Sequence, residues 1–262
     1  MSPGTALVAF GSGLLVAVLT APVGVSGAVF LLPVQLDVLR VPSPTVTPTN
    51  LLFNVISTPG ALLRYRHDHR AGGFGGVLTR RLVAGTLPGV MIGTLVRVFA
   101  APGERIFRLI AALVLLPLGI WLCTRRRSVV RPAPAIGTPA IVALGLAVGI
   151  VGGIYGIGGG SLLGPILVGA GLSVTAVAPA ALAATFLTSV AGVTAYAALS
   201  LTTDGPISPD WGIGLLCGVG GLIGGYLGAR LQPRMPETGL RILLGALAIL
   251  LALAYLAQAA RG

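Results

Sequence analysis

The sequence predicts an all-α polytopic membrane protein, and three features of its composition support this fold class. Of its 262 residues, 55% are hydrophobic and only 9% are charged, and the mean hydropathy is +0.99. A soluble domain carries about 25% charged residues, so this chain has too few charges to cover a water-facing surface. The apolar runs are long and lack the alternation of barrel strands. The membrane spans are therefore predicted to be helices.

The apolar runs divide into about eight hydrophobic units, since a helix needs about 20 apolar residues to cross a bilayer. The first unit joins runs 5–21 and 24–39, and the fifth joins runs 137–155 and 160–172, so glycine and proline interrupt both. The N-terminal stretch MSPGTALVAF has no positively charged region and is predicted to start the first span, not to be a cleaved signal peptide. The remaining units cover residues 47–63, 82–100, 106–123, 176–199, 211–229 and 239–258.

The chain contains an internal repeat at a shift of 132 residues. The coinciding positions include Gly24 with Gly156, Gly27 with Gly159, Pro33 with Pro165, and Ser57 with Ser189. Because 40 residues are glycine, single glycine matches carry little weight, whereas proline and serine matches in the same register indicate a duplication. We predict two homologous transmembrane repeats, residues 1–131 and 132–262.

The charges indicate topology, not a nucleic-acid partner. All 17 basic residues are arginine, the net charge is +11, and the arginines lie mainly between apolar runs, as in cytoplasmic loops. The loops 64–81 and 124–134 are rich in arginine, whereas loop 198–210 has none and carries two aspartates. The bias of corresponding loops is opposite in the two halves, which favours inverted repeats. A plain four-plus-four count of spans predicts parallel repeats instead.

The segment GIYGIGGGSLLGP, residues 153–165, interrupts the fifth hydrophobic unit. Glycine adopts backbone dihedrals that other residues avoid, so the chain is expected to leave the helix here, and Ser161 is predicted to cap a new short helix. The N–H groups at such a helix start favour anions. The first half has a counterpart, APVGVSGAVFLLP, at 21–33. Paired broken helices indicate a transport site; the alternative is close helix packing, which we prefer for residues 218–230.

Uncharged polar residues follow each interruption. In the segment 42–60, Asn50, Asn54 and Ser57 are spaced to share one helix face, and the segment 178–196 offers Thr185, Thr188, Ser189 and Tyr196. Such residues either line a cavity or bond their own helix carbonyls and neighbouring helices. Because the polar clusters occur in both halves, we favour a cavity lining.

The acidic residues do not form a cation pathway or a catalytic centre. A cation pathway or a carboxylate proton relay requires acids within the spans, and here five acids lie in predicted loops while Asp37 lies near the end of a short apolar piece. A neutral or positive cavity suits an anion. The isolated Cys123 and Cys217 and the lack of an HExxH motif predict no metal, cofactor or enzyme activity. The loop acids are Asp68, Glu104, Asp204, Asp210 and Glu237.

These motifs resemble the TauE/SafE family of membrane permeases, also called sulfite exporters. The resemblance rests on GIGGGSLLGP at 156–165, on its degenerate copy GVSGAVFLLP at 24–33, and on TPTNLLFNVISTPGALLRY at 47–65. It implies proton-coupled transport of sulfur-containing anions such as sulfite or an organosulfonate. Relatives often carry a Thr-Ser pair early in the helix after the break. This chain departs from them with Ala180-Ala181, so either the substrate differs from sulfite or the first half contributes more of the binding.

The sequence thus predicts a multi-pass secondary transporter of a small anion in the inner (plasma) membrane, working by alternating access. The favoured substrate is sulfite or a related sulfur oxyanion or organosulfonate. The alternatives are a passive anion channel and a non-transporting membrane scaffold. The predicted substrate-binding residues are Gly24, Ser26, Gly27, Thr49, Asn50, Asn54, Ser57, Gly158, Gly159, Gly160, Ser161, Thr185 and Ser189.

Overall fold

A computed structural model describes five stretches of the chain and is helical in all of them. The described residues are 2–66, 76–100, 104–124, 137–202 and 207–261. No strand occurs within these stretches, so the prediction of an all-α protein is confirmed. Residues 125–134 of the linker, residues 67–75 of the loop 64–81 (which include Asp68), and Asp204 fall outside the described residues.

Helices follow one another in the same order in the two halves. The first half contains α1 (Pro3–Thr20), a 3₁₀ turn (Ala21–Val23), α2 (Ala28–Pro33), a π turn (Val34–Val38), α3 (Ser43–Tyr65), α4 (Val77–Ala100) and α5 (Glu104–Thr124). The second half contains α6 (Thr138–Tyr155), α7 (Leu163–Gly169), α8 (Val174–Leu199), α9 (Trp211–Leu231), a 3₁₀ turn (Gln232–Arg234) and α10 (Glu237–Arg261). Thus α1 corresponds to α6, α2 to α7, and so on to α5 and α10.

Local sequence explains several helix starts. The Ser2 hydroxyl accepts a hydrogen bond from the Thr5 amide at the start of α1, and Ser173 caps α8 in the same way. Asp210 caps α9, because its carboxylate accepts a 2.9 Å hydrogen bond from the Ile213 amide. These residue types satisfy amides that have no partner inside the helix.

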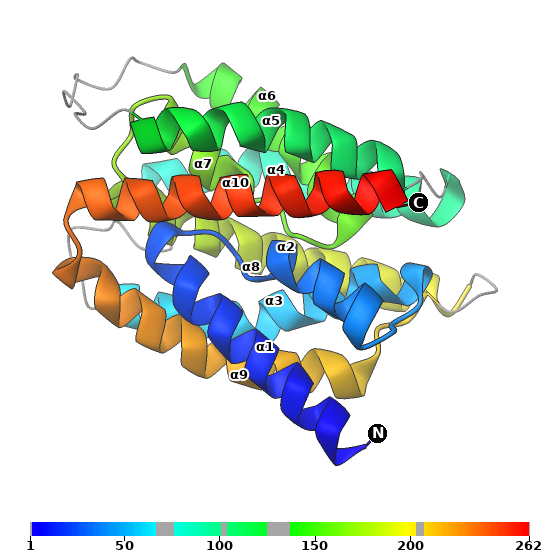
Figure 1. Cartoon of the computed structure of the whole chain (residues 1–262). Coiled ribbons are helices and arrows are strands. Elements are labelled where there is room, and N and C mark those ends of the chain that lie inside the picture. The colour runs from blue at the N-terminus through cyan, green and yellow to red at the C-terminus, as the bar shows by residue number, and fades with distance from the viewer. Residues whose placement is uncertain (1, 67–75, 101–103, 125–136, 203–206, 262) are drawn as a thin grey trace.

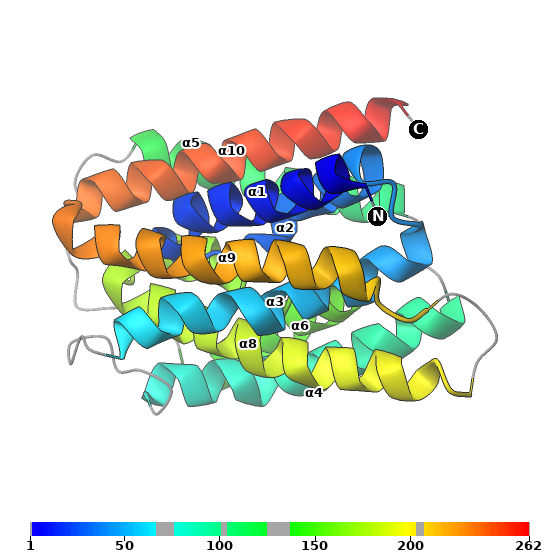
Figure 2. The ribbon, with the colours of Figure 1, turned by 90° about the horizontal axis from the view of Figure 1, so that it is seen from below.

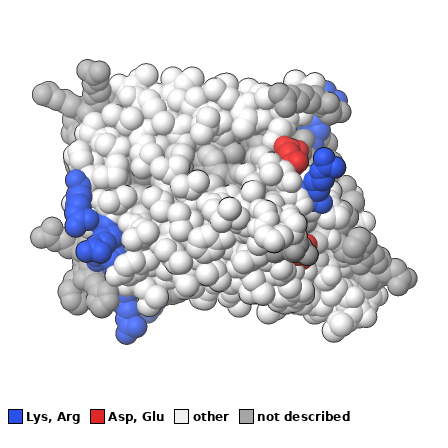
Figure 3. Space-filling view, turned by 60° about the horizontal axis from the view of Figure 1, so that its bottom comes forward, with Lys and Arg blue, Asp and Glu red and all other residues white. Residues whose placement is uncertain are grey.

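Six of the described helices are long and apolar enough to cross a membrane. The long helix α3 is absent from this set, because the polar residues between Thr45 and Thr58 make it less apolar than the other long helices. In the space-filling view the arginine side chains gather at the two ends of the molecule, and a wide uncharged belt lies between them (Figure 3). This distribution fits a protein whose middle is surrounded by lipid.

Close helix pairs join the two halves through glycine. A Cβ atom on Gly220 of α9 would lie 2.1 Å from the Phe10 carbonyl oxygen of α1, and one on Gly224 would lie 2.2 Å from that of Leu14. In the matching pair, a Cβ on Gly93 of α4 would lie 2.1 Å from the Ile150 carbonyl oxygen of α6. The packing interpretation of residues 218–230 is therefore confirmed, and each half supplies one helix to both pairs (Figure 1).

The directions of corresponding helices distinguish parallel repeats from inverted ones. In Figure 2, α1, α3 and α9 run from the end that holds the N-terminus towards the opposite end, whereas α4, α8 and α10 run the other way. The corresponding helices α3 and α8 are thus opposed, as are α4 and α9. These directions are the ones expected of inverted repeats; the inverted repeat, its orientation in a membrane and the division at residue 131 stay predictions.

Candidate functional site

Two irregular segments interrupt the helices at the centre of the fold. We call residues 24–27, between the first 3₁₀ turn and α2, the first break, and residues 156–162, between α6 and α7, the second break. Gly24 and Gly156 begin them in left-handed conformations, with φ of 74° and 72°. A Cβ on Gly24 would lie 2.2 Å from Ala178 Cα, and one on Gly156 would lie 2.3 Å from the Thr47 carbonyl oxygen. Each break therefore rests directly against the long helix that follows the break of the other half.

Two tyrosines tie the breaks in place. The Tyr65 hydroxyl of α3 donates a 2.8 Å hydrogen bond to the Ala21 carbonyl, and the Tyr196 hydroxyl of α8 donates a 3.0 Å hydrogen bond to the Gly153 carbonyl. Ala21 and Gly153 occupy the same place in the 132-residue register. Both bonds reach carbonyls near the end of a broken helix, and the Ala21 carbonyl also accepts a 3.1 Å hydrogen bond from the Gly24 amide.

Three polar side chains lie against Gly158 and Gly160 of the second break: the methyl group of Thr185 faces Gly158, and its hydroxyl faces Gly160, at 2.6 Å from a Cβ placed there. Gly158 has a φ of 74°, and a Cβ placed on it would lie 2.7 Å from Thr185 Cγ2, 3.0 Å from Ser189 Oγ and 3.3 Å from Asn54 Nδ2. All three side chains are fully buried. Asn54 Nδ2, Thr185 Oγ1 and Ser189 Oγ have no hydrogen-bond partner among the described residues. We call these three atoms the donor cluster.

The hydroxyls of the donor cluster differ from those of other buried threonines, which donate hydrogen bonds to carbonyls of their own helix. Other buried threonines, such as Thr86 and Thr188, donate to the carbonyl four residues earlier, at 2.8 Å and 2.7 Å. Thr185 and Ser189 do not, although they lie on the same kind of helix. A buried polar atom without a partner costs roughly 1–3 kcal/mol, so three of them beside one break make it the candidate ligand site.

A hydrogen bond from the first break orients Asn54 of α3. The Ser26 hydroxyl of the first break donates to Asn54 Oδ1, and it accepts a 3.2 Å hydrogen bond from the Ala28 amide. Because Oδ1 is engaged by Ser26, the amide nitrogen of Asn54 is directed to Gly158. Nδ2 can only donate hydrogen bonds, which suits an anion.

The predicted capping role of Ser161 is wrong. Its hydroxyl donates a 2.6 Å hydrogen bond back to the Ile157 carbonyl, and α7 begins only at Leu163, with no side-chain cap. The Gly159 amide is already used as well, because it donates a 3.0 Å hydrogen bond to Thr188 Oγ1. Since α7 has only seven residues, the side chains of the donor cluster, and not a helix dipole, make the second break suitable for an anion.

A buried aromatic ring and a small cavity lie at the first break. Phe53 is fully buried, and a Cβ on Gly27 would lie 3.1 Å from its ring. Beside it lies a cavity of about 20 Å³, lined by Ser26, Gly27 and Ser57 among others. A cavity of this size holds about one water molecule, so the first break offers no room for a larger anion in this conformation.

The remaining predicted residues lie around the breaks in different roles. Asn50 Nδ2 donates a 2.8 Å hydrogen bond to the Ala28 carbonyl and so supports the start of α2. Thr49 lies against the segment before α9, where its hydroxyl accepts a 2.8 Å hydrogen bond from the Asp210 amide. Gly160 allows close contact with α8, since a Cβ there would lie 1.9 Å from the Ala181 carbonyl oxygen. The structure therefore places Thr49 apart from the donor cluster.

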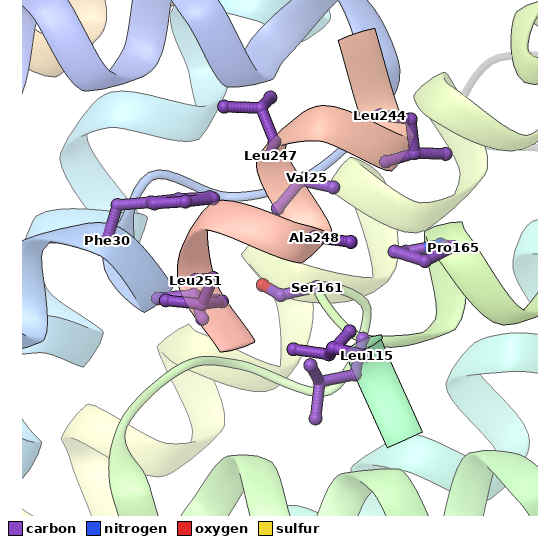
Figure 4. Close-up of a pocket in the computed structure, with 11 residues that line it drawn as sticks. Val25, Phe30, Leu115, Ser161, Pro165, Leu244, Leu247, Ala248 and Leu251 are labelled. Atoms are coloured by element: carbon purple, nitrogen blue, oxygen red, sulfur yellow. The ribbon is translucent and has the colours of Figure 1, made fainter. Parts of the chain in front are cut away.

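A shallow apolar hollow lies on the other side of the second break. It is formed by α10, α2, α5 and the second break, and Ser161 is its polar member (Figure 4). Because the Ser161 hydroxyl is bonded to its own backbone, this hollow presents no free polar group from that residue. Its apolar lining suits a lipid chain or a neighbouring helix better than an anion.

The structure adds four residues that were absent from the predicted site. Thr188 holds the Gly159 amide, and Thr86 of α4 packs on Gly159, where a Cβ would lie 2.5 Å from Thr86 Cβ. Gln35 in the π turn and Thr94 in α4 are fully buried with side-chain atoms that lack a described partner. A lone polar residue in an apolar run was the available signal for Gln35 and Thr94.

Charged groups lie away from the donor cluster. Arg97 donates to the Ser43 hydroxyl at 2.9 Å, and Arg241 forms an ion pair with Glu237 at 3.4 Å. Asp37 accepts a 3.3 Å hydrogen bond from Gln258 on an exposed part of the molecule. No group of three metal-ligating His, Cys, Asp or Glu side chains occurs among the described residues.

Comparison with known proteins gives one match. The family model described as sulfite exporter TauE/SafE matches residues 9–255. No curated protein and no solved structure matches the chain. The family model spans both breaks, all long helices and nearly the whole chain, and its members are membrane transporters and not enzymes. The chain therefore belongs to the TauE/SafE sulfite exporter family.

Proposed function

We propose that the protein is a secondary transporter that carries a small anion through the inner membrane by alternating access. The proposed substrate is sulfite or a related sulfur oxyanion or organosulfonate, as the family description suggests. The observation that carries the proposal is the donor cluster, in which three buried side-chain atoms at a helix break lack partners among the described residues. An anion bound there would accept the hydrogen bonds for which the described residues provide no acceptor.

The arrangement of the halves supports alternating access. The donor cluster combines Asn54 of α3 with Thr185 and Ser189 of α8, and these helices come from different halves. The interhalf pairs α1–α9 and α4–α6 are packed through glycine, with few large side chains between them. Rocking of one half against the other would open the cluster to one side and then to the other.

The test is counterflow of labelled sulfite in proteoliposomes loaded with unlabelled sulfite. Thr185→Val removes one donor of the cluster while keeping its shape, and we expect about a tenfold or greater loss of initial rate, because a charge-assisted hydrogen bond contributes roughly 1.5–3 kcal/mol. The matched control is Thr194→Val on the same helix, where the hydroxyl is exposed and bonds only backbone carbonyls. That variant should exchange at the wild-type rate.

Three other results would contradict the proposal. Flux without counterflow would indicate a passive channel, and absence of flux from folded protein would indicate a scaffold. Equal rates in Thr185→Val and Thr194→Val would remove the donor cluster from the transport route. Uptake driven by an imposed pH gradient tests the proton coupling that belongs to the same proposal.

A further inference from the structure

The donor cluster holds no ionised group. Arg241 is the only charged side chain among the buried residues that the structure describes, and it donates to the Leu172 carbonyl, before the start of α8. Leu172 and Thr185 are separated by about 20 Å along the chain direction of α8, at about 1.5 Å per residue. Arg97 bonds the first residue of α3, and Ser43 precedes Asn54 by about 16 Å on the same scale. The cluster itself therefore offers an anion neutral dipoles only.

Neutral dipoles suit one negative charge better than two. The cost of moving an ion out of water rises steeply with its charge. Two or three neutral hydrogen-bond donors are enough to hold a buried carboxylate in its charged form. The cluster provides this number of donors, in Asn54 Nδ2, Thr185 Oγ1 and Ser189 Oγ. The cluster contains no cation that would offset the higher burial cost of a dianion.

The cluster can also accept a proton carried by the substrate. Asn54 Nδ2 only donates, but the hydroxyls of Thr185 and Ser189 can each donate and accept. A singly protonated oxyanion could therefore receive a hydrogen bond from Asn54 on a bare oxygen and donate its own O–H to one of the hydroxyls. Both hydroxyls are free for this, since neither has a described partner.

We propose that the donor cluster selects a monoanion, so that hydrogen sulfite is the transported form of sulfite and tetrahedral dianions such as sulfate are rejected. This inference rests on the proposed transport function. It also has a consequence for coupling. Hydrogen sulfite carries its own proton, so transport depends on pH without any carboxylate in the spans to relay protons.

The first experiment compares two competitors of fixed charge in the sulfite counterflow assay. Methanesulfonate is a monoanion and sulfate a dianion throughout the working pH range, and both have tetrahedral sulfur and similar size. We expect methanesulfonate to compete at least about tenfold more strongly, because of the higher burial cost of the second charge. Equal or stronger competition by sulfate would overturn the inference.

The second experiment varies the pH equally on both sides of the membrane. At constant total sulfite, the rate of exchange should rise as the pH falls through the second pKa of sulfurous acid, while counterflow of labelled methanesulfonate stays constant. Protein-free liposomes correct for passive permeation. If the rate of sulfite exchange rises instead with the concentration of the sulfite dianion, as the pH increases, the inference is overturned.

The outcomes separate this inference from the proposed function. If sulfite exchanges normally and sulfate competes as well as methanesulfonate, transport stands and the preference for a monoanion falls. If folded protein exchanges none of these anions, the proposed function falls and the inference falls with it.

Discussion

At the first break Phe53 fills the position that Thr185 takes at the second break. At the next position the polar residue is in the first half and the aromatic residue in the second, since Asn54 corresponds to Phe186 in the 132-residue register. As a result Asn54 reaches across to the second break, where it joins Thr185 and Ser189 around Gly158. The two breaks share a left-handed glycine at their start, but only the second one has polar side chains of both halves without described partners beside it. The two predicted repeats therefore differ at the positions that would make a single site.

The largest expected effect tests what the breaks share. Gly24→Ala and Gly156→Ala should each prevent folding or strongly destabilise the protein, because a left-handed conformation costs a non-glycine residue about 1–3 kcal/mol and the new methyl group would overlap backbone atoms at 2.2–2.3 Å. Gly11→Ala on α1 is the control, since nothing lies within 4 Å of its added Cβ. Thermal unfolding in detergent measures the difference. Wild-type stability of either break variant would show that the left-handed turns are dispensable.

The next effect tests how the breaks differ. Ser189→Ala removes an atom of the donor cluster, and we expect about a tenfold loss of sulfite counterflow, as for other hydrogen bonds to a charged ligand. Ser57→Ala changes the corresponding serine of the first break, which lines the small cavity, and we expect less than about a twofold loss, because its hydroxyl lies outside the donor cluster. A larger loss in Ser57→Ala would reverse the assignment of the site.

A smaller effect concerns the support of the second break. Thr188→Val removes the acceptor of the Gly159 amide, and we expect a loss of about 1–3 kcal/mol of stability, because a buried N–H is left without a partner. Counterflow should fall less than in Ser189→Ala, since Thr188 does not belong to the donor cluster. Unfolding and transport are measured on the same preparation, and the reverse order of transport loss would contradict the role assigned to Thr188.

The smallest effect should be equal at the two breaks. Tyr65→Phe and Tyr196→Phe each remove one hydrogen bond to a corresponding carbonyl, and we expect each to cost about 1 kcal/mol of stability. Chemical unfolding of the two variants side by side gives the comparison. A large difference between them would show that the two tyrosines are not equivalent.

Much of the fold follows from the sequence because its causes are local. Long apolar runs with few charges require helices in a bilayer, and the repeat at 132 residues places the breaks at Gly24 and Gly156, where the structure shows left-handed glycines. The prediction failed at Ser161, since the helix after the break starts at Leu163 and the serine bonds backward. Several glycines in a row allow many local paths, and contacts with α8 and α4 select one of them.

By itself the sequence determined the family, the all-α membrane fold and the two paired breaks, because composition, hydropathy and a repeated motif are properties of the chain alone. The tertiary structure decided which polar residues remain without partners. Asn50, Asn54 and Ser57 share one helix face and look equivalent in sequence, yet Asn50 is bonded to the Ala28 carbonyl and Asn54 points to Gly158. Whether a side-chain amide is hydrogen-bonded depends on which backbone lies opposite it, and the packing between the two halves sets that position.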